Sequence, residues 1–289
     1  MRRLTAGLVG LAMVWALAGC AARSERPAAG PRPVAAPTTG PARPRPAPAV
    51  KQRGAQFGGR QVNLAVYYLQ SFAGRRYLAP EVHPVPYTRA VATAALGELL
   101  GGRPLARGAR RPFPASARLR SVQLDEGTIT IDLSAAAMPA MAGPDRRWAL
   151  QALVHTATQF PKVQRAEVRV EGEAVAGPLA RDPSMPLAPI VVVEPAAGAL
   201  VEGERLVVKG DASVYEGTVS LRLRDRRGQV MAQSYATAAE GAPGRGPFAG
   251  ALRFIPPASP QDWTLEAFEV SPENGDVLYA VRLPVWVGR

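Results

Sequence analysis

The stretch SVQLDEGTITIDLS, residues 121–134, decides the fold of the first half of the chain. Apolar residues occupy every second position on both sides of Asp125-Glu126-Gly127, whose residue types are typical of a tight turn. Alternation of this kind places all the apolar side chains on one face of each strand. The stretch therefore predicts a β-hairpin with one face directed towards a core.

Helical patterns flank this hairpin on both sides. Thr88 and Asp145 are each positioned to cap a stripe of apolar residues at helical spacing. Alternating runs at the start and the end of the unit predict two further strands. The order β-α-β-β-α-β over residues 60–176 predicts an α+β unit, a small sheet with two helices on one face.

Four segments of this unit match a known family in order and spacing. They are LGELLG at 96–101, the hairpin at 121–134, FPKV at 160–163 and VRVEG at 168–172. Residues 60–176 thereby resemble the GerMN domain of sporulation and spore germination proteins, although His83 stands where the family pattern has arginine. The resemblance implies a fold similar to the ring-building motifs of secretion and sporulation channels, and hence assembly rather than catalysis.

Prolines mark a linker at 177–188, and the residues that follow, 189–289, have a different pattern. Seven short strand-like runs without a helical stripe predict an all-β, immunoglobulin-like sandwich that is stable without a disulfide. The runs are 190–193, 205–209, 217–224, 229–235, 248–254, 264–270 and 277–287. The expected aromatic core residues are Phe254, Trp263, Phe268 and Trp286.

Three segments of this second unit resemble the Gmad2 immunoglobulin-like domain. They are GDASVYEGTV at 210–219, GPF at 246–248 and EVSPENG at 269–275. The Gmad2 domain is associated with GerMN in spore germination proteins. The resemblance therefore implies an extracytoplasmic pair of domains, without specifying a ligand.

Residues 1–20 are typical of a bacterial export signal. Arg2 and Arg3 precede an uncharged apolar run that ends at Leu17-Ala18-Gly19-Cys20. That ending resembles the lipobox of lipoproteins, which implies that Cys20 is the lipid attachment site and that the chain is anchored on the extracytoplasmic face of the cell membrane. The alternative is an ordinary secreted protein with an incidental cysteine.

A disordered basic tether rich in proline and alanine is predicted for residues 21–59. It carries seven basic residues and one acidic residue, so its net charge of 7 − 1 = +6 is half of the formal +12 of the chain. The arginines either contact an anionic polymer or keep a spacer soluble and extended. Nucleic acid is not an expected partner, because an exported and anchored protein does not meet it.

The chain offers few residues for catalysis or metal binding. It has one cysteine and two histidines, His83 and His155, and contains no nucleophile elbow, zinc-protease or phosphate-loop motif. A metal site would need the two histidines to converge, and a glycosidase would need a close pair of carboxylates. The carboxylates considered are Asp125, Glu126, Asp132 and Glu216, for which turn and structural roles are favoured. No catalytic, metal-binding or cofactor-binding residue is predicted.

The sequence thus predicts a lipid-anchored lipoprotein of the cell envelope that acts as a non-catalytic assembly or scaffold module in a sporulation- or germination-like role. The expected partners are the bilayer, through acylated Cys20, and envelope proteins or further copies of the chain, through residues 60–176. The alternative is a module that binds peptidoglycan or another anionic wall polymer. The two hypotheses differ in salt dependence, because polymer binding weakens steeply with ionic strength.

Overall fold

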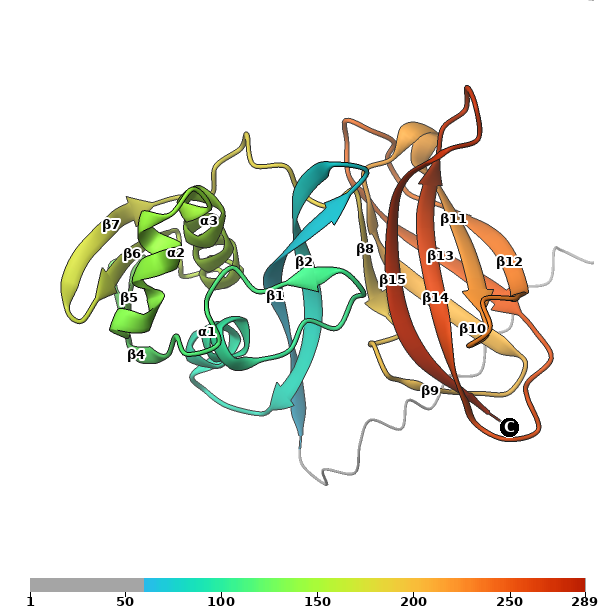
Figure 1. The fold of residues 1–289 in the computed structure, drawn as a ribbon, viewed down its shortest axis with the longest axis horizontal. Helices are drawn as coiled ribbons and strands as arrows, with labels where there is room; N and C mark the ends of the chain where they lie inside the picture. The colour runs from blue at the N-terminus through green and yellow to red at the C-terminus, as the bar shows by residue number, and fades with distance from the viewer. Residues whose placement is uncertain (1–59, 289) are drawn as a thin grey trace, which may run out of the picture. The chain divides into compact units, whose positions relative to one another are not determined.

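The computed structural model describes residues 60–288 of the 289-residue chain. They form an α+β domain followed by an all-β sandwich, which confirms the predicted fold class (Figure 1). The proposed signal, the lipobox with Cys20 and the proline-rich tether lie outside the described residues. Within residues 60–288, no helix has the length and the hydrophobicity needed to cross a membrane.

The predicted hairpin is confirmed and forms one edge of a four-stranded sheet in the first domain. At the turn of this hairpin, Glu126 and Gly127 both have positive φ angles, of 44° and 80°, as in the mirror-image turns that match strand twist. The strands lie in the order β4 (Leu119–Asp125), β5 (Thr128–Leu133), β6 (Arg165–Val170) and β7 (Glu173–Leu179). Strands β5 and β6 are parallel, and their connection contains α2 (Met138–Ala142) and α3 (Arg146–Ala157).

The expectation of one sheet with helices on one face is incomplete, because the first domain has two sheets. The second sheet contains β1 (Gln61–Phe72), β2 (Arg75–Pro86) and the short β3 (Ala109–Arg110), in the order β2-β1-β3. The helices α1 (Val91–Gly101) and α3 lie between the two sheets, and a single apolar core extends across all three layers (Figure 1). Strand β1 is buried on both faces, since Tyr68 and Leu69 point to opposite sides of the strand and are both fully buried.

Pro80, Pro84 and Pro86 are typical of a loop, but they lie in strand β2. The three prolines lie at alternate positions, so all their missing N–H groups are on one side of the strand. Leu78 lies an even number of residues from these prolines and so faces the same side. Its backbone N–H and C=O form hydrogen bonds with Pro186 and Ala188 rather than with β1. The prolines therefore leave the pairing between β1 and β2 intact.

The starts of the two helices differ from expectation. Thr88 accepts a hydrogen bond from the Ala90 N–H at 3.1 Å before α1 begins, and makes no bond to the helix itself. Asp145 occupies the N-cap position of α3, but its carboxylate pairs with Arg76 and Arg110. The carboxylate of Asp145 thus binds the two arginines instead of the N–H groups of the helix. Hydrogen bonds from these arginines hold the pKa of Asp145 below its usual value.

The second domain is a sandwich of two antiparallel sheets with a short parallel addition. One sheet has the order β13-β10-β8 and the other β12-β11-β14-β15-β9. The bounds are β8 (Ile190–Glu194), β9 (Leu200–Glu202), β10 (Arg205–Ala212), β11 (Thr218–Arg224), β12 (Val230–Thr237), β13 (Gly246–Arg253), β14 (Gln261–Val270) and β15 (Val277–Gly288). The predicted runs correspond to seven of these strands, and β9 was missed because it has only three residues.

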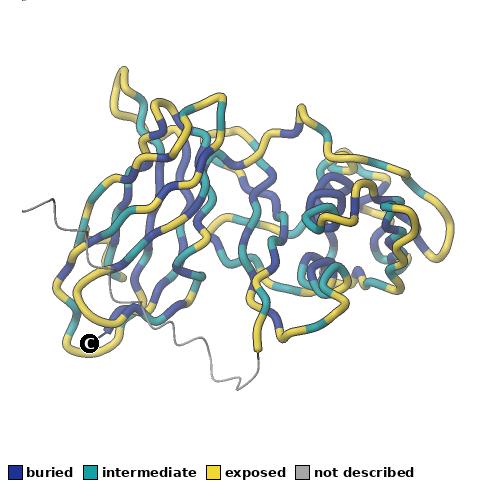
Figure 2. The backbone as a smooth tube through the Cα atoms, turned by 180° about the vertical axis from the view of Figure 1, so that it is seen from behind, coloured by how far each residue is buried: buried dark blue, intermediate teal, exposed yellow. Residues whose placement is uncertain are grey.

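Three of the four predicted aromatic core residues are buried, and one is not. Phe254, Trp263 and Phe268 are at most 6 % exposed, whereas Trp286 is 49 % exposed. Trp286 lies between Val285 and Val287, which are both fully buried, so the alternation of β15 directs its side chain outwards. Figure 2 shows the resulting pattern, with buried positions concentrated inside each domain and exposed positions in the loops.

Candidate functional site

The two histidines do not share a site. His83 lies on β2, where its Nδ1 is 3.1 Å from a Glu98 carboxylate oxygen and its Nε2 is 3.6 Å from Glu81. His155 lies on α3 against the ring of Tyr67, with a centroid separation of 5.0 Å. In residues 60–288 no cluster of three His, Cys, Asp or Glu residues could hold a metal ion.

The four candidate carboxylates have structural surroundings. Asp125 and Glu126 form the exposed turn between β4 and β5. Asp132 accepts a hydrogen bond from the Gly172 N–H at 3.0 Å and lies 3.2 Å from the Arg120 guanidinium. Glu216 occupies a single turn of 3₁₀ helix in the other domain, with a φ of 50°. The structure therefore shows no paired arrangement for glycosidic chemistry among them.

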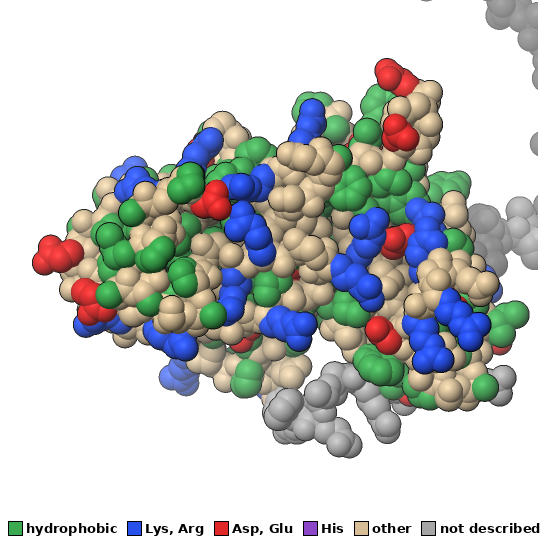
Figure 3. All heavy atoms as spheres, viewed as in Figure 1, with side chains coloured by type: hydrophobic (Ala, Val, Ile, Leu, Met, Phe, Trp, Pro, Cys, Tyr) green, Lys and Arg blue, Asp and Glu red, His purple; other side chains and the backbone are tan. Residues whose placement is uncertain are grey.

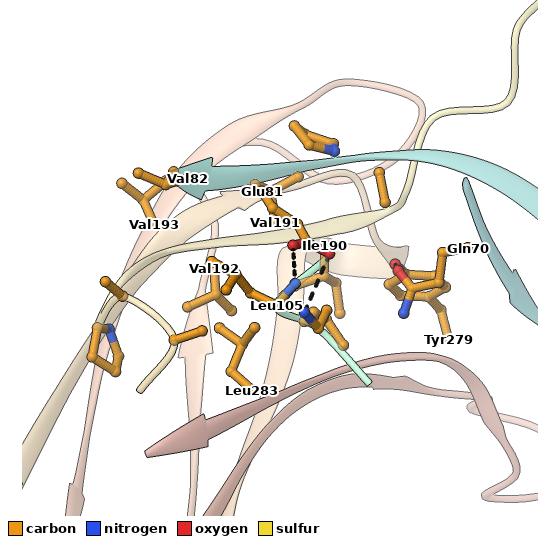
Figure 4. Close-up of a pocket in the computed structure, with 17 residues that line it drawn as sticks. Gln70, Glu81, Val82, Leu105, Ile190, Val191, Val192, Val193, Tyr279 and Leu283 are labelled. Carbon is orange, nitrogen blue, oxygen red and sulfur yellow. Dashed lines mark hydrogen bonds between the residues drawn. The ribbon is translucent and has the colours of Figure 1, made fainter. Parts of the chain in front are cut away.

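A small cavity of about 20 Å³ lies between the two domains (Figure 4). Glu81 lies on its wall, and its carboxylate accepts hydrogen bonds from the N–H groups of Leu105 and Ala106 at 2.5 and 3.2 Å. The Tyr279 hydroxyl of the second domain donates to Gln70 Oε1 of the first at 2.6 Å. Burial raises the pKa of Tyr279, so its hydroxyl remains a donor at neutral pH.

The cavity belongs to a joint between the domains rather than to an open binding site. Main-chain hydrogen bonds connect Leu78 N–H to Pro186 O at 2.8 Å and Arg107 N–H to Arg282 O at 3.0 Å. Ala79 and Ala106 of the first domain are part of the apolar core of the second. Packing and hydrogen bonds of this kind couple the domains. No local sequence pattern indicated the joint, because Gln70 and Tyr279 are 209 residues apart.

An open groove lies on the first domain, beside the predicted hairpin. It has a volume of about 550 Å³ and is lined by the start of α1, by β4 and β5, and by residues 160–163. Most of the lining is apolar, and it includes Leu124, which is 50 % exposed. Arg89 and Lys162 supply positive charge at the groove. The groove thus combines accessible apolar surface with basic side chains.

Strand β4 borders this groove and has only one partner strand. It is the terminal strand of its sheet, and among the described residues only β5 pairs with it. The opposite side of β4 therefore has backbone N–H and C=O groups free to pair with another strand. Val122 and Leu124 of β4 also line the groove, so pairing surface and apolar surface are adjacent.

Two family models match the chain, one for each domain. The Germane family, described as "Sporulation and spore germination", matches residues 65–176. The Gmad2 family, described as "Immunoglobulin-like domain of bacterial spore germination", matches residues 189–276. The chain is a GerMN–Gmad2 protein. The resemblance drawn from the sequence is thus confirmed for both domains. In the GerMN–Gmad2 protein, the groove and the β4 edge belong to the GerMN domain.

Solved structures of GerMN domains are similar to part of this GerMN–Gmad2 protein. The tandem GerMN domains of the sporulation protein GerM from Bacillus subtilis share 21 % identity, with 47 % of this chain and 51 % of that chain covered and a TM-score of 0.39. The first GerMN domain of GerM shares 23 % identity over 44 % of this chain and 96 % of that one, with a TM-score of 0.35. The match thus spans about half of the tandem structure. No curated protein matches the chain significantly.

Proposed function

We propose that this GerMN–Gmad2 protein is a lipid-anchored, extracytoplasmic assembly module without catalytic activity, in an envelope process of the sporulation or germination type. In this proposal a second protein chain adds a strand to the free edge of β4 and places apolar side chains in the adjacent groove. The observation that carries the proposal is the combination of this edge with the exposed apolar side chain of Leu124.

Backbone pairing and the burial of apolar side chains would both favour assembly at the β4 edge. Strand addition supplies main-chain hydrogen bonds, and pockets for alternate side chains supply specificity. Leu124 and Val122 lie on the strand that would be extended, so apolar surface is buried as the backbone pairs. The joint between the domains supports this role, because two domains that are packed together hold their binding partners in a fixed relative position.

Leu124→Arg is expected to weaken assembly at least tenfold, which corresponds to about 1.4 kcal/mol. A charged side chain in the groove would have to be desolvated when the partner binds, whereas in the free protein it remains in water because position 124 is half exposed. The measurement is the yield of crosslinked complex from intact cells that express the full-length chain, with thermal unfolding of the purified variant as the check on folding.

The matched control is Ile255→Arg, which places the same charge at an apolar residue that is 83 % exposed in the second domain. The control should give the crosslinked yield of the original chain. Equal yields for the two variants, with both chains folded, would show that the groove is not the assembly surface.

Anchoring makes a separate prediction at Cys20. Diacylglycerol on this thiol adds two acyl chains, each of which contributes about 0.8 kcal/mol per buried CH₂, and two chains are sufficient for stable anchoring. Cys20→Ala should therefore move most of the protein from the membrane fraction to the soluble fraction. Fractionation of cells followed by immunoblotting measures this distribution. A variant that remains membrane-bound and unprocessed to the same extent would refute the lipobox.

A further inference from the structure

Three arginines surround one buried carboxylate on the outer face of the large sheet of the second domain. The strand register places Arg222 of β11 opposite Glu266 of β14, and Glu266 opposite Arg282 of β15. Arg224, two residues along β11, lies on the same face. Only 6 % of Glu266 is exposed. The cluster has three positive charges and one negative charge, so its formal net charge is 3 − 1 = +2.

The geometry of the cluster leaves guanidinium groups available for a second anion. Glu266 is contacted through the Nε atoms of the arginines, at 2.9 Å from Arg224, 2.8 Å from Arg282 and 3.1 Å from Arg222. Within residues 60–288, the terminal nitrogens of Arg222 and Arg282 have no hydrogen-bond partner. Burial opposes the charged form of Glu266, but hydrogen bonds from Arg282 and Arg224 outweigh it and hold its pKa below the usual value.

Exposed aromatic surface lies on the same face. Trp286 is four residues from Arg282 on β15, at about 13 Å along the strand, and the alternation of β15 directs both side chains outwards. On β15 only Pro284 lies between them on this face, with Thr264 of β14 opposite it and Arg224 of β11 opposite Thr264. Asp262 is opposite Trp286 and is exposed. Negative charge therefore lies at the tryptophan end, and positive charge at the arginine end.

The view of this face in Figure 3 shows Lys and Arg side chains gathered over the second domain, with few acidic side chains among them. We call Arg222, Arg224, Arg282 and Trp286 the arginine–tryptophan face. Three cations for one internal carboxylate are more than is needed to neutralise Glu266. Ion pairing with Glu266 accounts for the Nε contacts, and Arg222 also stacks on the ring of Phe268 at 4.3 Å. These roles leave the terminal nitrogens of Arg282, whose side chain is 44 % exposed, without a partner among residues 60–288.

We infer that the arginine–tryptophan face binds an extended acidic polysaccharide, with a carboxylate of the glycan at the arginines and a sugar ring against Trp286. Guanidinium groups bind carboxylates through pairs of parallel hydrogen bonds, and Arg224 and Arg282 each already donate one hydrogen bond to the carboxylate of Glu266. The C–H face of a sugar ring packs against an aromatic ring, which is the contact an exposed tryptophan offers. The separation of about 13 Å selects an extended ligand over a small ion.

This inference is independent of the assembly proposal. It uses the second domain, whereas assembly uses the groove and β4 of the first. A polymer site on one domain and a protein site on the other would allow the coupled pair to connect an assembly to an acidic matrix.

The test is the binding of the full-length chain to oligomers of galacturonic acid, measured by titration calorimetry, with neutral glucose oligomers of equal length as the comparison. We expect the acidic oligomers to bind, the neutral ones to bind at least tenfold more weakly, and the affinity to fall as salt rises from 50 to 300 mM. Arg282→Gln and Trp286→Ala should each weaken binding about tenfold, which is about 1.4 kcal/mol.

Two controls match these variants. Arg253→Gln removes an exposed arginine from the other sheet, and Tyr87→Ala removes an aromatic that is 54 % exposed in the first domain. Both should bind as the original chain does. Because Trp286→Ala changes only an exposed side chain, it tests the inference even if Arg282→Gln loses stability. Equal binding of neutral oligomers, unchanged affinity in Trp286→Ala, or binding to phosphatidylglycerol vesicles without binding to the acidic oligomers would overturn the inference.

Discussion

Gly210→Val is expected to unfold the second domain, lowering the free energy of unfolding by more than about 4 kcal/mol. Gly210 is a buried residue of β10 at a register shift in the pairing between β10 and β8. A Cβ atom there would overlap the Val191 carbonyl oxygen and lie 2.8 Å from the ring of Phe248. Relief of the clash would require β8 to move away from β10, which breaks the pairing between the two strands.

The matched control is Gly97→Ala, where no atom lies within 4 Å of the added Cβ. Gly97 is exposed in the middle of α1, so alanine should be neutral or stabilise the chain by about 0.5–1 kcal/mol. Urea unfolding followed by circular dichroism measures both effects. A Gly210→Val chain with the midpoint of the original protein would contradict the close packing described for β10.

His155 is expected to make the protein less stable in acid by about 3 kcal/mol between pH 7 and pH 4. Only 3 % of the residue is exposed, and neither ring nitrogen has a hydrogen-bond partner in the described part of the chain. Burial, followed by the nearby charge of Arg181, lowers the pKa of His155 to about 4. The unfolded chain has the ordinary pKa of about 6.5.

The sign follows from which state binds the proton. Between about pH 6.5 and pH 4 the unfolded chain protonates His155 and the folded chain does not, so stability is complete above that window and is lost as the pH falls through it. Each pKa unit of difference corresponds to 1.36 kcal/mol. His155→Leu keeps the buried volume roughly constant and removes the titration. Urea unfolding at pH 7, 5.5 and 4 should therefore show a shallower acid loss in the variant, whereas identical pH profiles would contradict a buried neutral histidine.

Local patterns predicted much of the fold. The hairpin at 121–134 was predictable because its turn needs residues that tolerate positive φ, and Glu126-Gly127 meets that need directly after an alternating strand. The same alternation could also have predicted the exposure of Trp286, since its neighbours Val285 and Val287 share the opposite face. The large apolar side chain of Trp286 favours a core position, but its place in the alternation of β15 determines its exposure.

Other features had no local signal. Strand β2 was missed because three prolines within one segment disfavour a strand. They are compatible with β2 because their missing N–H groups lie on the side that does not pair with β1, and the sequence alone does not show which side that is. No sequence pattern distinguishes Arg222, Arg224 and Arg282 from other charged residues, and only the register of three strands places them around Glu266. The groove beside β4 likewise depends on residues 160–163, which approach the hairpin through the parallel pairing of β5 and β6.

Crosslinking of intact cells, followed by mass spectrometry of what is captured on the full-length chain, tests the central claim most directly. The account predicts crosslinks from residues near β4 and the groove of the first domain, either to a second copy of the chain or to one discrete envelope protein. Capture of wall fragments without any protein partner, or protein crosslinks that avoid residues 60–176 altogether, would contradict the assembly function.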